Sequence, residues 1–344
     1  MKLSICIPTY NRAAHLADCL NSIILCDVQS NFNFEVCISD NGSTDGTEDV
    51  VRVAQSVINI KYHKNAVNLG MTRNFLNVVS MAEGDFVWMI GDDDLLVPNA
   101  IAKLYRLIDS HPKVDFFYVN SFHLNTEYLK NFSSPFDTAN LPENMEPFSK
   151  WAIAGEVDFL ELIDPRISFD FLGGIFLSVF RRENWNLNAD VLDGNAVKDD
   201  RVFSHFDNTF PHVKIFANAF RDSRAYLNTQ PLSVCLTGAR EWSPMYPFVR
   251  SVRLVEALGE YRKNGLSYRK YIYCKNYALG NCIPDFIRIL ANRKRSGYIF
   301  IRPFKLFLDY GCYPNFYLSI FYFIGGRISR FYRRLLEYAI NRYF

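Results

Sequence analysis

Three consecutive carboxylates, Asp92, Asp93 and Asp94, follow an apolar run at residues 86–90. Placing three like charges at the end of a buried strand is costly unless a cation offsets them. Carboxylate oxygens favour Mg²⁺ or Mn²⁺, and a metal held by one or two of them keeps positions open for a diphosphate. The alternative is that the aspartates cap a helix that starts near Pro98. The triplet therefore predicts a divalent-metal site.

The elements that must position this triplet can be read from the first 120 residues. Short β-branched or aromatic runs alternate there with segments whose apolar residues recur at helical spacing. The runs that predict strands are 3–8, 34–39, 60–63, 85–90 and 114–119. The segments that predict helices are 13–25, 47–57, 72–82 and 99–110. Repeated strand–helix–strand units predict an α/β fold with a parallel sheet, whose ligands bind at the carboxyl ends of the strands.

The pattern changes in the second half of the chain. Residues 121–170 predict a long irregular insertion. Two further strands and a helix are predicted at 174–180, 225–236 and 213–220. Beyond Gly238 the sequence becomes helical, basic and aromatic. We therefore expect an α/β domain at 1–238 and a helical, membrane-associating region at 239–344.

Charge is divided along the same line. From Ala239 to the end there are 19 Lys and Arg against 6 Asp and Glu, or +13, which leaves 19 against 30, or −11, for residues 1–238. The basic residues of the tail that alternate with aromatic ones are Arg288, Arg293, Lys294, Arg295, Arg302, Lys305, Arg327, Arg330, Arg333 and Arg334. The aromatic ones are Tyr298, Phe300, Phe304, Phe307, Phe316, Tyr317, Phe321, Tyr322, Phe323, Phe331 and Tyr332.

Such a tail predicts an amphipathic segment at an anionic membrane surface. A helical lid or a dimer surface is the alternative, so an oligomer is left open. Nucleic-acid binding is disfavoured, because the other part of the chain is acidic and no nucleic-acid module occurs.

Several classes of protein are disfavoured by what the sequence lacks. There is no GxGxxG after the first strand and no GxxxxGK[ST], so neither a dehydrogenase-type dinucleotide fold nor a P-loop is supported. We expect no targeting signal, because the first residues run directly into a strand and a polar turn. The longest apolar stretch, 316–324, is too short to span a bilayer. Eight cysteines without a CxxC pair predict reduced core thiols and a cytoplasmic protein.

Four segments resemble, in order, the successive motifs of family 2 glycosyltransferases. They are 4–12 (SICIPTYNR), 38–47 (ISDNGSTDGT), 68–74 (NLGMTRN) and 91–98 (GDDDLLVP). The set covers about residues 1–120, with a looser match to about 238. The pattern is similar to the bacterial abequosyltransferase-like branch, which adds a dideoxyhexose to a lipid-linked O-antigen unit. The resemblance implies a GT-A fold, which is Rossmann-like with a mostly parallel sheet flanked by helices, and here with a helical, basic-aromatic C-terminal region.

The resemblance also implies roles for individual residues. Asp94 matches the metal ligand, although Gly91 stands where many members carry an acidic residue, so the direct ligand among the three aspartates is open. The residues that match or adjoin the nucleotide-sugar site are Pro8, Thr9, Tyr10, Arg12, Asp40, Arg73, Asp92 and Asp93. Alternatives remain: Tyr10 could pack the turn, Asp40 could form an Asx turn, and Arg73 could be a solvated helix residue.

Glycosyl transfer also needs a base that removes the proton of the acceptor hydroxyl. In the family this carboxylate opens a helix on the acceptor side. The candidates are Asp199, Asp200 and Asp207, and we choose Asp207 because the apolar-periodic run 213–220 follows it. The alternative is that Asp207 merely caps that helix.

Together these features predict a metal-dependent, inverting glycosyltransferase on the inner face of the bacterial cytoplasmic membrane. It would use Mg²⁺ or Mn²⁺ and move a sugar from a nucleoside diphosphate to a lipid-linked oligosaccharide in O-antigen or polysaccharide biosynthesis. The rival hypotheses are a nucleotidyltransferase and a non-catalytic sugar-nucleotide-binding protein.

Overall fold

The computed structural model describes residues 1–27, 32–238, 242–321 and 323–324. The chain divides into two compact units. The first comprises Met1–Arg240 with Lys263–Gly265, and the second comprises Glu241–Arg262 with the chain from Leu266 onward.

The N-terminal part of the first unit is a parallel sheet. Its strands are β1 (Leu3–Thr9), β2 (Phe34–Asp40), β3 (Ile60–Lys64) and β4 (Phe86–Met89). They pair in parallel in the order β3-β2-β1-β4. The middle strands are buried almost throughout, because helices cover both faces, and this is why they read as continuous apolar runs.

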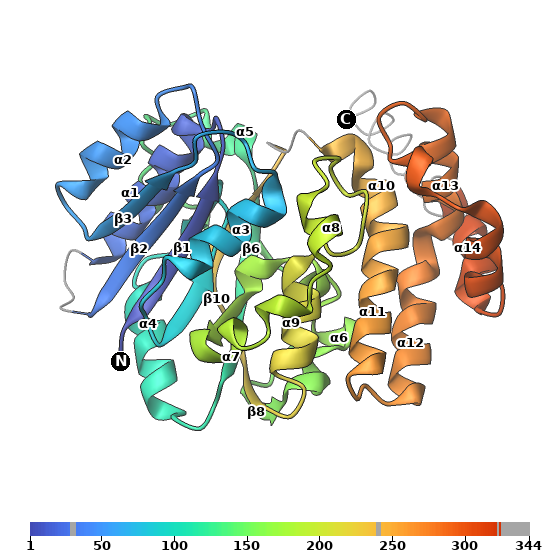
Figure 1. Cartoon of the computed structure of the whole chain (residues 1–344). Helices are drawn as coiled ribbons and strands as arrows, with labels where there is room; N and C mark the ends of the chain where they lie inside the picture. Colours follow the sequence, from blue (N-terminus) through green and yellow to red (C-terminus); the bar gives the residue numbers. More distant parts are fainter. Residues whose placement is uncertain (28–31, 239–241, 322, 325–344) are drawn as a thin grey trace, which may run out of the picture. The chain divides into compact units, whose positions relative to one another are not determined.

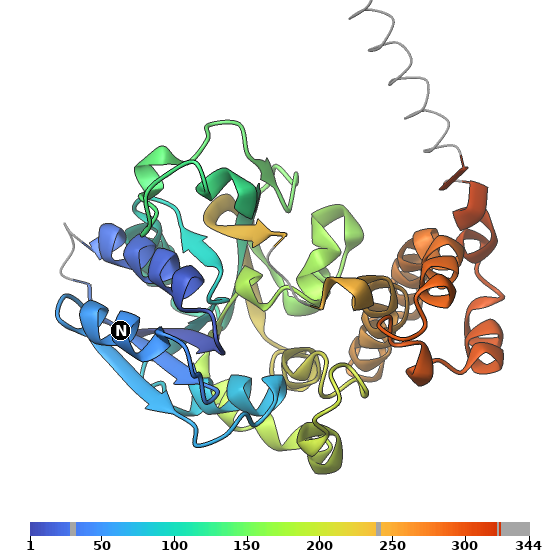
Figure 2. The same ribbon diagram turned by 90° about the horizontal axis from the view of Figure 1, so that it is seen from above.

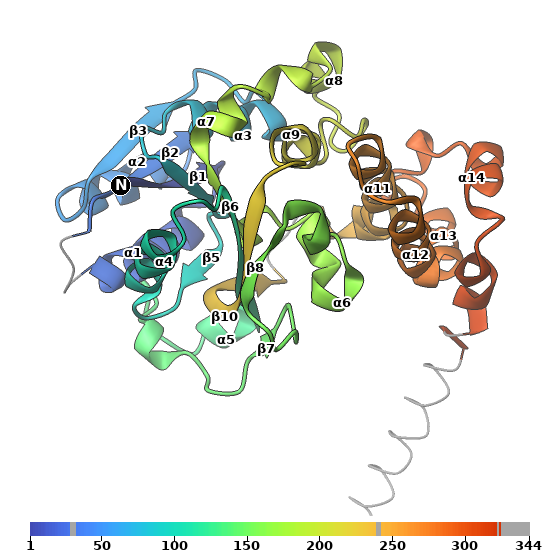
Figure 3. The ribbon, with the colours of Figure 1, turned by 90° about the horizontal axis from the view of Figure 1, so that it is seen from below.

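The helices of this part match the predicted segments closely. They are α1 (Ala13–Asp27), α2 (Thr47–Gln55), α3 (Met71–Ser80) and α4 (Ala100–Ser110). Helix α1 packs against α2 and α4 on one face, and α3 packs on β1 and β2 from the other face (Figures 1 and 3). Figure 2 shows the same layers from the opposite side. The predicted α/β layering is therefore confirmed.

The rest of the sheet is mixed. Its strands include β5 (Asp94–Leu96), β6 (Phe116–Asn125), β9 (Ser178–Arg181) and β10 (Arg224–Thr237). Strand β9 runs antiparallel between β4 and β6, whereas β10 is parallel to β6 and antiparallel to β5. The strand predicted at 174–180 is corrected at its start, because Ile175–Leu177 form a 3₁₀ turn. The carbonyl of Phe176 accepts a hydrogen bond from Trp88 Nε1 at 3.0 Å instead of joining the ladder.

The expectation that residues 121–170 are irregular is also corrected. Strand β6 extends to Asn125, β7 (Glu146–Pro147) pairs with β6, and β8 (Gly155–Asp158) pairs with β10. Strands this short are too brief for a periodic pattern, so only their long-range ladders reveal them. The remaining short helices of this unit are α5 (Thr126–Leu129), α6 (Pro165–Ser168), α7 (Arg182–Asn186), α8 (Gly194–Lys198) and α9 (Pro211–Ala219).

Aromatic rings form much of the core behind this part of the sheet. The ring centroid of Phe116 lies 4.8 to 5.8 Å from those of Phe159, Phe171, Phe216 and Phe220, and all four pairs are edge to face. Such pairs add to the free energy of simple burial. These phenylalanines therefore form part of the interior of the first unit.

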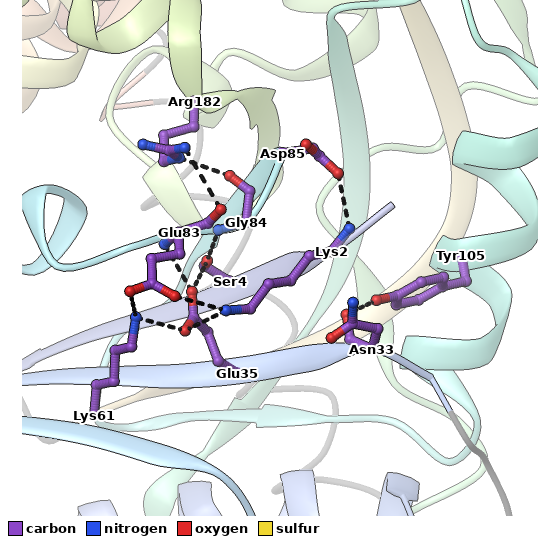
Figure 4. Close-up of polar contacts among 10 residues, drawn as sticks. All are labelled: Lys2, Ser4, Asn33, Glu35, Lys61, Glu83, Gly84, Asp85, Tyr105 and Arg182. Atoms are coloured by element: carbon purple, nitrogen blue, oxygen red, sulfur yellow. Dashed lines mark hydrogen bonds and ion pairs between the residues drawn. The ribbon is translucent and has the colours of Figure 1, made fainter.

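A buried charge cluster holds the amino-terminal ends of the strands together (Figure 4). Glu35 in β2 is fully buried and accepts hydrogen bonds from Lys2 Nζ at 2.9 Å and Ser4 Oγ at 2.7 Å. Lys61 Nζ lies 3.0 Å from it, and the backbone N–H of Glu83 donates to it at 2.7 Å. Burial alone would raise the pKa of Glu35, but these partners lower it to about 2. The cluster lies at the edge of the sheet remote from the acidic triplet.

The second unit is helical. Its helices are α10 (Tyr246–Phe248), α11 (Leu254–Lys263), α12 (Tyr268–Ala278), α13 (Cys282–Ala291) and α14 (Pro303–Tyr310). Asp285 of α13 is fully buried and accepts hydrogen bonds from Arg250 Nη2 at 2.6 Å and Ser251 Oγ at 2.6 Å. This paired charge ties α13 to the helical turn Val249–Arg253.

Two expectations about the chain as a whole can be compared with the structure. Within its described ranges, no helix is long and apolar enough to cross a membrane. Seven of the eight cysteines are buried, and Cys312 is exposed. The predicted tail residues Tyr322, Arg327, Arg330, Phe331, Tyr332, Arg333 and Arg334 lie outside the described residues.

Candidate active site

The site is built where β1, β2 and β4 end. Thr9 is the last residue of β1 and pairs in register with Asp40, the last residue of β2. Strand β4 lies on the other side of β1 and leads into the turn Gly91-Asp92-Asp93 before β5. The parallel pairing thus brings three of the predicted motifs to one edge of the sheet.

The acidic triplet is buried and tied to β1. Asp92 Oδ2 accepts a hydrogen bond from Thr9 Oγ1 at 2.8 Å, and its Oδ1 accepts one from Arg12 Nη1 at 2.9 Å. Arg12 Nη2 also pairs with Asp93 Oδ2 at 3.2 Å, and Asp94 Oδ2 accepts from the Gly91 N–H at 2.7 Å. Burial raises the pKa of Asp92 to about 7, although Arg12 opposes the shift. The turn therefore brings two carboxyl groups beside the guanidinium of Arg12.

The divalent-cation site expected at these carboxylates stays a prediction. A Cβ on Gly91 would lie 2.8 Å from Asp93 Oδ1 and 3.1 Å from Asp94 Oδ2, so two carboxylate oxygens crowd a point that only glycine leaves open. In the described part of the chain, no group of three His, Cys, Asp or Glu side chains is arranged to hold a metal by itself. A Mg²⁺ or Mn²⁺ ion bound by one or two carboxylates completes its shell with water and ligand phosphates.

Asp40 has both carboxylate oxygens engaged. Oδ1 accepts from the Ser43 N–H at 2.8 Å, and Oδ2 accepts from the Tyr62 hydroxyl at 2.7 Å. Burial, with the nearby Asp40 carboxylate, raises the pKa of Tyr62 well above its usual value. Asp40 thus closes the turn Asp40–Ser43, and its role in binding the nucleotide stays a prediction.

The loop after β1 supplies the exposed part of the site. Asn11 has a positive φ of 52°, its N–H donates to Ser43 Oγ at 2.8 Å, and its Oδ1 accepts from the Thr44 N–H at 2.7 Å. These bonds join the loop to the turn that follows β2. Pro8 is half-buried at the end of β1, and the ring of Tyr10 is exposed at the rim.

A network of asparagines, which the sequence analysis did not single out, holds the third motif. Asn74 Nδ2 donates to the Ser39 carbonyl at 2.9 Å and the Thr9 carbonyl at 3.4 Å. Asn41 Nδ2 donates to Asn68 Oδ1 at 2.8 Å, and Asn41 Oδ1 accepts from the Leu69 N–H at 2.8 Å. The available signal was the recurrence of Asn at the end of a strand or the start of a helix in three of the four motifs.

Arg73 joins this edge to the acidic segment after α8. Its Nη2 pairs with Asp200 Oδ1 at 3.1 Å, and Asp200 also lies beside Gly70, whose φ is +85°. The side chain of Asp200 is 80% exposed. Of the three candidate bases, Asp200 is therefore brought beside a predicted donor-binding residue and remains open to water.

The other two candidates are held differently. Asp207 is 2% exposed, and its Oδ2 accepts from Lys214 Nζ at 2.8 Å and from the Asp193 N–H at 2.7 Å. It does not cap the following helix, because α9 begins at Pro211 and its N-cap is Phe210. Asp199 accepts hydrogen bonds from the guanidinium of Arg201, and these bonds keep the pKa of the carboxyl well below its usual value.

Comparison with solved structures identifies the architecture. The chain aligns with the crystal structure of S. aureus TarS 1-349 in complex with UDP at a TM-score of 0.56 and 17% identity, covering 95% of this chain and 92% of that one. The structure of the same protein in complex with UDP-GlcNAc aligns at a TM-score of 0.50 and 18% identity, covering 83% and 81%. The fold is of the GT-A type.

Comparison of sequences gives the family. Residues 4–152 match Glycosyl transferase family 2, so this part of the chain is a domain of that family. The chain is 34% identical over 250 residues to abequosyltransferase RfbV of Salmonella typhimurium, and the alignment covers 68% of this chain and 66% of that protein. It is 32% identical over 112 residues to poly(ribitol-phosphate) beta-N-acetylglucosaminyltransferase TarS of Staphylococcus aureus, which covers 32% of this chain and 19% of that protein. The chain thus spans less than two thirds of the length of these curated relatives.

Proposed function

We propose that this protein transfers a sugar from a nucleoside-diphosphate donor to a hydroxyl group of a lipid-linked oligosaccharide in O-antigen or polysaccharide biosynthesis. The observation that carries the proposal is the buried cluster of Thr9, Arg12 and the aspartate triplet at the carboxyl edge of the sheet. The likeness to an abequosyltransferase supports a dideoxyhexose, such as abequose, as the donated sugar.

The donor side is formed by the loops after β1, β2 and β3. The exposed ring of Tyr10 offers a face for a base, and Arg73 supplies a cation near the same edge. Arg12 already bridges two of the carboxylates, so it holds the acidic turn in place while the donor binds. Asp40 contributes by fixing the Asn41–Ser43 turn. The nucleotide would lie next to this turn.

Asp94, with Asp92 or Asp93, would hold Mg²⁺ or Mn²⁺. When bound, such an ion stabilises the negative charge of the departing diphosphate. The backbone N–H of Gly91 orients the Asp94 carboxylate through its 2.7 Å hydrogen bond. The absence of a Cβ at Gly91 leaves the two carboxylates room to approach each other.

The contacts favour Asp200 over Asp207 as the base. The base must take the acceptor proton as the hydroxyl oxygen bonds to the anomeric carbon and the bond to the diphosphate breaks, with inversion at that carbon. Asp200 is exposed and next to Arg73, whereas Asp207 is buried with a lysine partner. The Asp207 carboxylate is buried, so an acceptor hydroxyl cannot reach it, and its ion pair with Lys214 fixes its orientation.

A screen of UDP-, GDP-, CDP- and dTDP-sugars with Mn²⁺ tests the proposal. A ligand that binds only the native state raises the melting temperature, and the matching donor should then release its nucleoside diphosphate when a lipid-linked acceptor is added. A nucleotidyltransferase would instead form pyrophosphate from a nucleoside triphosphate and a sugar phosphate. A donor that raises the melting temperature but never turns over would indicate the non-catalytic alternative.

The site of action is also part of the proposal. An acceptor carried on a polyprenyl diphosphate places the enzyme at the inner face of the bacterial cytoplasmic membrane, as a peripheral protein. The excess positive charge after residue 238 supports attraction to anionic lipid.

A further inference from the structure

Helix α14 carries an apolar stripe that faces away from its own unit. Leu306 and Tyr310 are buried against neighbouring residues, whereas Phe304 is 76%, Phe307 53% and Leu308 63% exposed. Residues at spacings of three and four share one face of a helix, so the last three form a continuous stripe. We call Phe304, Phe307 and Leu308 the α14 stripe.

The neighbouring segments expose apolar residues in the same way. Ile299 in the turn before α14 is 81% exposed. In the helical segment after it, Tyr317, Leu318 and Phe321 are exposed at spacings of one and four. Isolated exposed apolar residues are ordinary, but a cluster of large ones marks an interaction surface.

The charges around the α14 stripe identify its partner. Residues 286–324 contain six Lys and Arg against a single acidic residue, Asp309. Among the described residues, Lys294, Arg295, Arg302 and Lys305 form no ion pair, and all four are exposed. Arg302 and Lys305 adjoin the α14 stripe in the chain, and cations next to an apolar stripe complement a surface that is anionic outside and apolar beneath.

We propose that the α14 stripe inserts into the headgroup boundary of an anionic phospholipid bilayer while Arg302 and Lys305 bind lipid phosphates. This inference rests on the proposed function, whose acceptor is lipid-linked, and names the element that meets the membrane. A second copy of the chain fits less well, because a symmetric contact would bring the same set of cations face to face. Protein interfaces are also depleted in lysine.

The test is flotation of the full chain with vesicles of phosphatidylglycerol and phosphatidylethanolamine, and with vesicles of phosphatidylcholine. We expect wild type to float with the anionic vesicles. The single change Phe304→Ser should weaken binding about tenfold, because it removes one inserted aromatic side chain. The change Lys305→Ala should weaken binding about fivefold on anionic vesicles and leave phosphatidylcholine unaffected.

A matched control is Leu187→Ser, because Leu187 is 73% exposed but lies on the first unit. It should float like wild type, and circular dichroism should show that each variant keeps its helices. Flotation of the triple variant Phe304→Ser, Phe307→Ser, Leu308→Ser at the wild-type level would overturn the proposal, as would a wild type that stays in solution. If wild type fails to float and sediments as a dimer that the triple variant dissociates, the stripe is instead covered by a second copy.

Flotation needs neither donor nor acceptor, so a failure of the membrane inference can be told apart from a failure of the glycosyltransferase proposal. Loss of vesicle binding in the triple variant with normal donor-induced stabilisation would separate the membrane surface from the active site. If the protein floats normally but shows no turnover with any donor, the membrane-binding role of the α14 stripe is supported and the proposed function is ruled out.

Discussion

Arg73 at the start of α3 and Asp200 after α8 form an ion pair of 3.1 Å although 127 residues separate them in the chain. The pair joins the loop that follows β3 to the acidic segment in the second half of the first unit. It places an exposed carboxylate beside a residue predicted to bind the donor. The pair is the basis for proposing Asp200 as the base.

The change Asp200→Asn should lower kcat about 10²-fold or more, because an amide cannot accept the proton of the acceptor hydroxyl. Donor affinity should change little, since the amide still accepts a hydrogen bond from Arg73. Steady-state transfer and donor titration measure the two effects separately. Asp222→Asn is the control, because Asp222 is 89% exposed and pairs with its neighbour Arg221. Wild-type kcat in Asp200→Asn would rule this residue out.

The change Lys214→Met should lower the free energy of unfolding by about 1–3 kcal/mol, because it leaves the buried Asp207 carboxylate without its cation. Urea unfolding measures the loss. Lys150→Met is the control, since that lysine pairs with Glu146 on the surface.

The same buried pair tests the original choice of base. If Asp207 is structural, Asp207→Asn should reduce stability and transfer together, and transfer should recover at low temperature. A variant with wild-type stability and no transfer would return the role of base to Asp207.

The change Asp94→Ala should reduce metal-dependent nucleotide release about 10²-fold. Without the Asp94 carboxylate the divalent ion would no longer be held where it stabilises the departing diphosphate. Chelation of divalent metal from wild type should give a similar loss, restored by Mn²⁺. Asp49→Ala is the control, since that side chain is 71% exposed. Release that is insensitive both to Asp94→Ala and to chelation would remove the metal from the mechanism.

Protonation of Glu35 should lower the free energy of unfolding in acid. Its pKa is lowered from 4.5 to about 2 in the folded chain, so its stabilisation is present above about pH 4.5 and is lost as pH falls towards 2. Glu35→Gln should lower the free energy of unfolding at neutral pH by about 2–3 kcal/mol, allowing for the partly exposed lysines. It should also flatten the pH dependence below 4.5.

Denaturant unfolding at several pH values measures both effects. Glu48→Gln is the control, because Glu48 pairs with Lys64 on the surface, at the carboxyl end of β3 and away from the buried cluster. An unchanged acid profile in Glu35→Gln would show that the cluster in Figure 4 contributes no net stability.

Much of the site could be predicted from local patterns. The apolar runs that become β1 and β2 and the polar residues at their ends, such as Thr9 and Asp40, are properties of short stretches of chain. Parallel strands then place these ends at one edge without further information. The same reasoning failed for β7 and β8, because strands of two and four residues leave no period to detect.

What the sequence alone determined is the α/β layering, the aspartate turn at the sheet edge and the basic, aromatic second half of the chain, since these follow from periodicity and composition. Only the tertiary structure decided which charges meet. Arg12 with Asp92, Arg73 with Asp200, and Asp207 with Lys214 each depend on how distant or adjoining segments pack. The two candidate bases Asp200 and Asp207 have the same side chain, so the sequence cannot distinguish them. Only packing decides that Asp207 is buried and that water can reach Asp200.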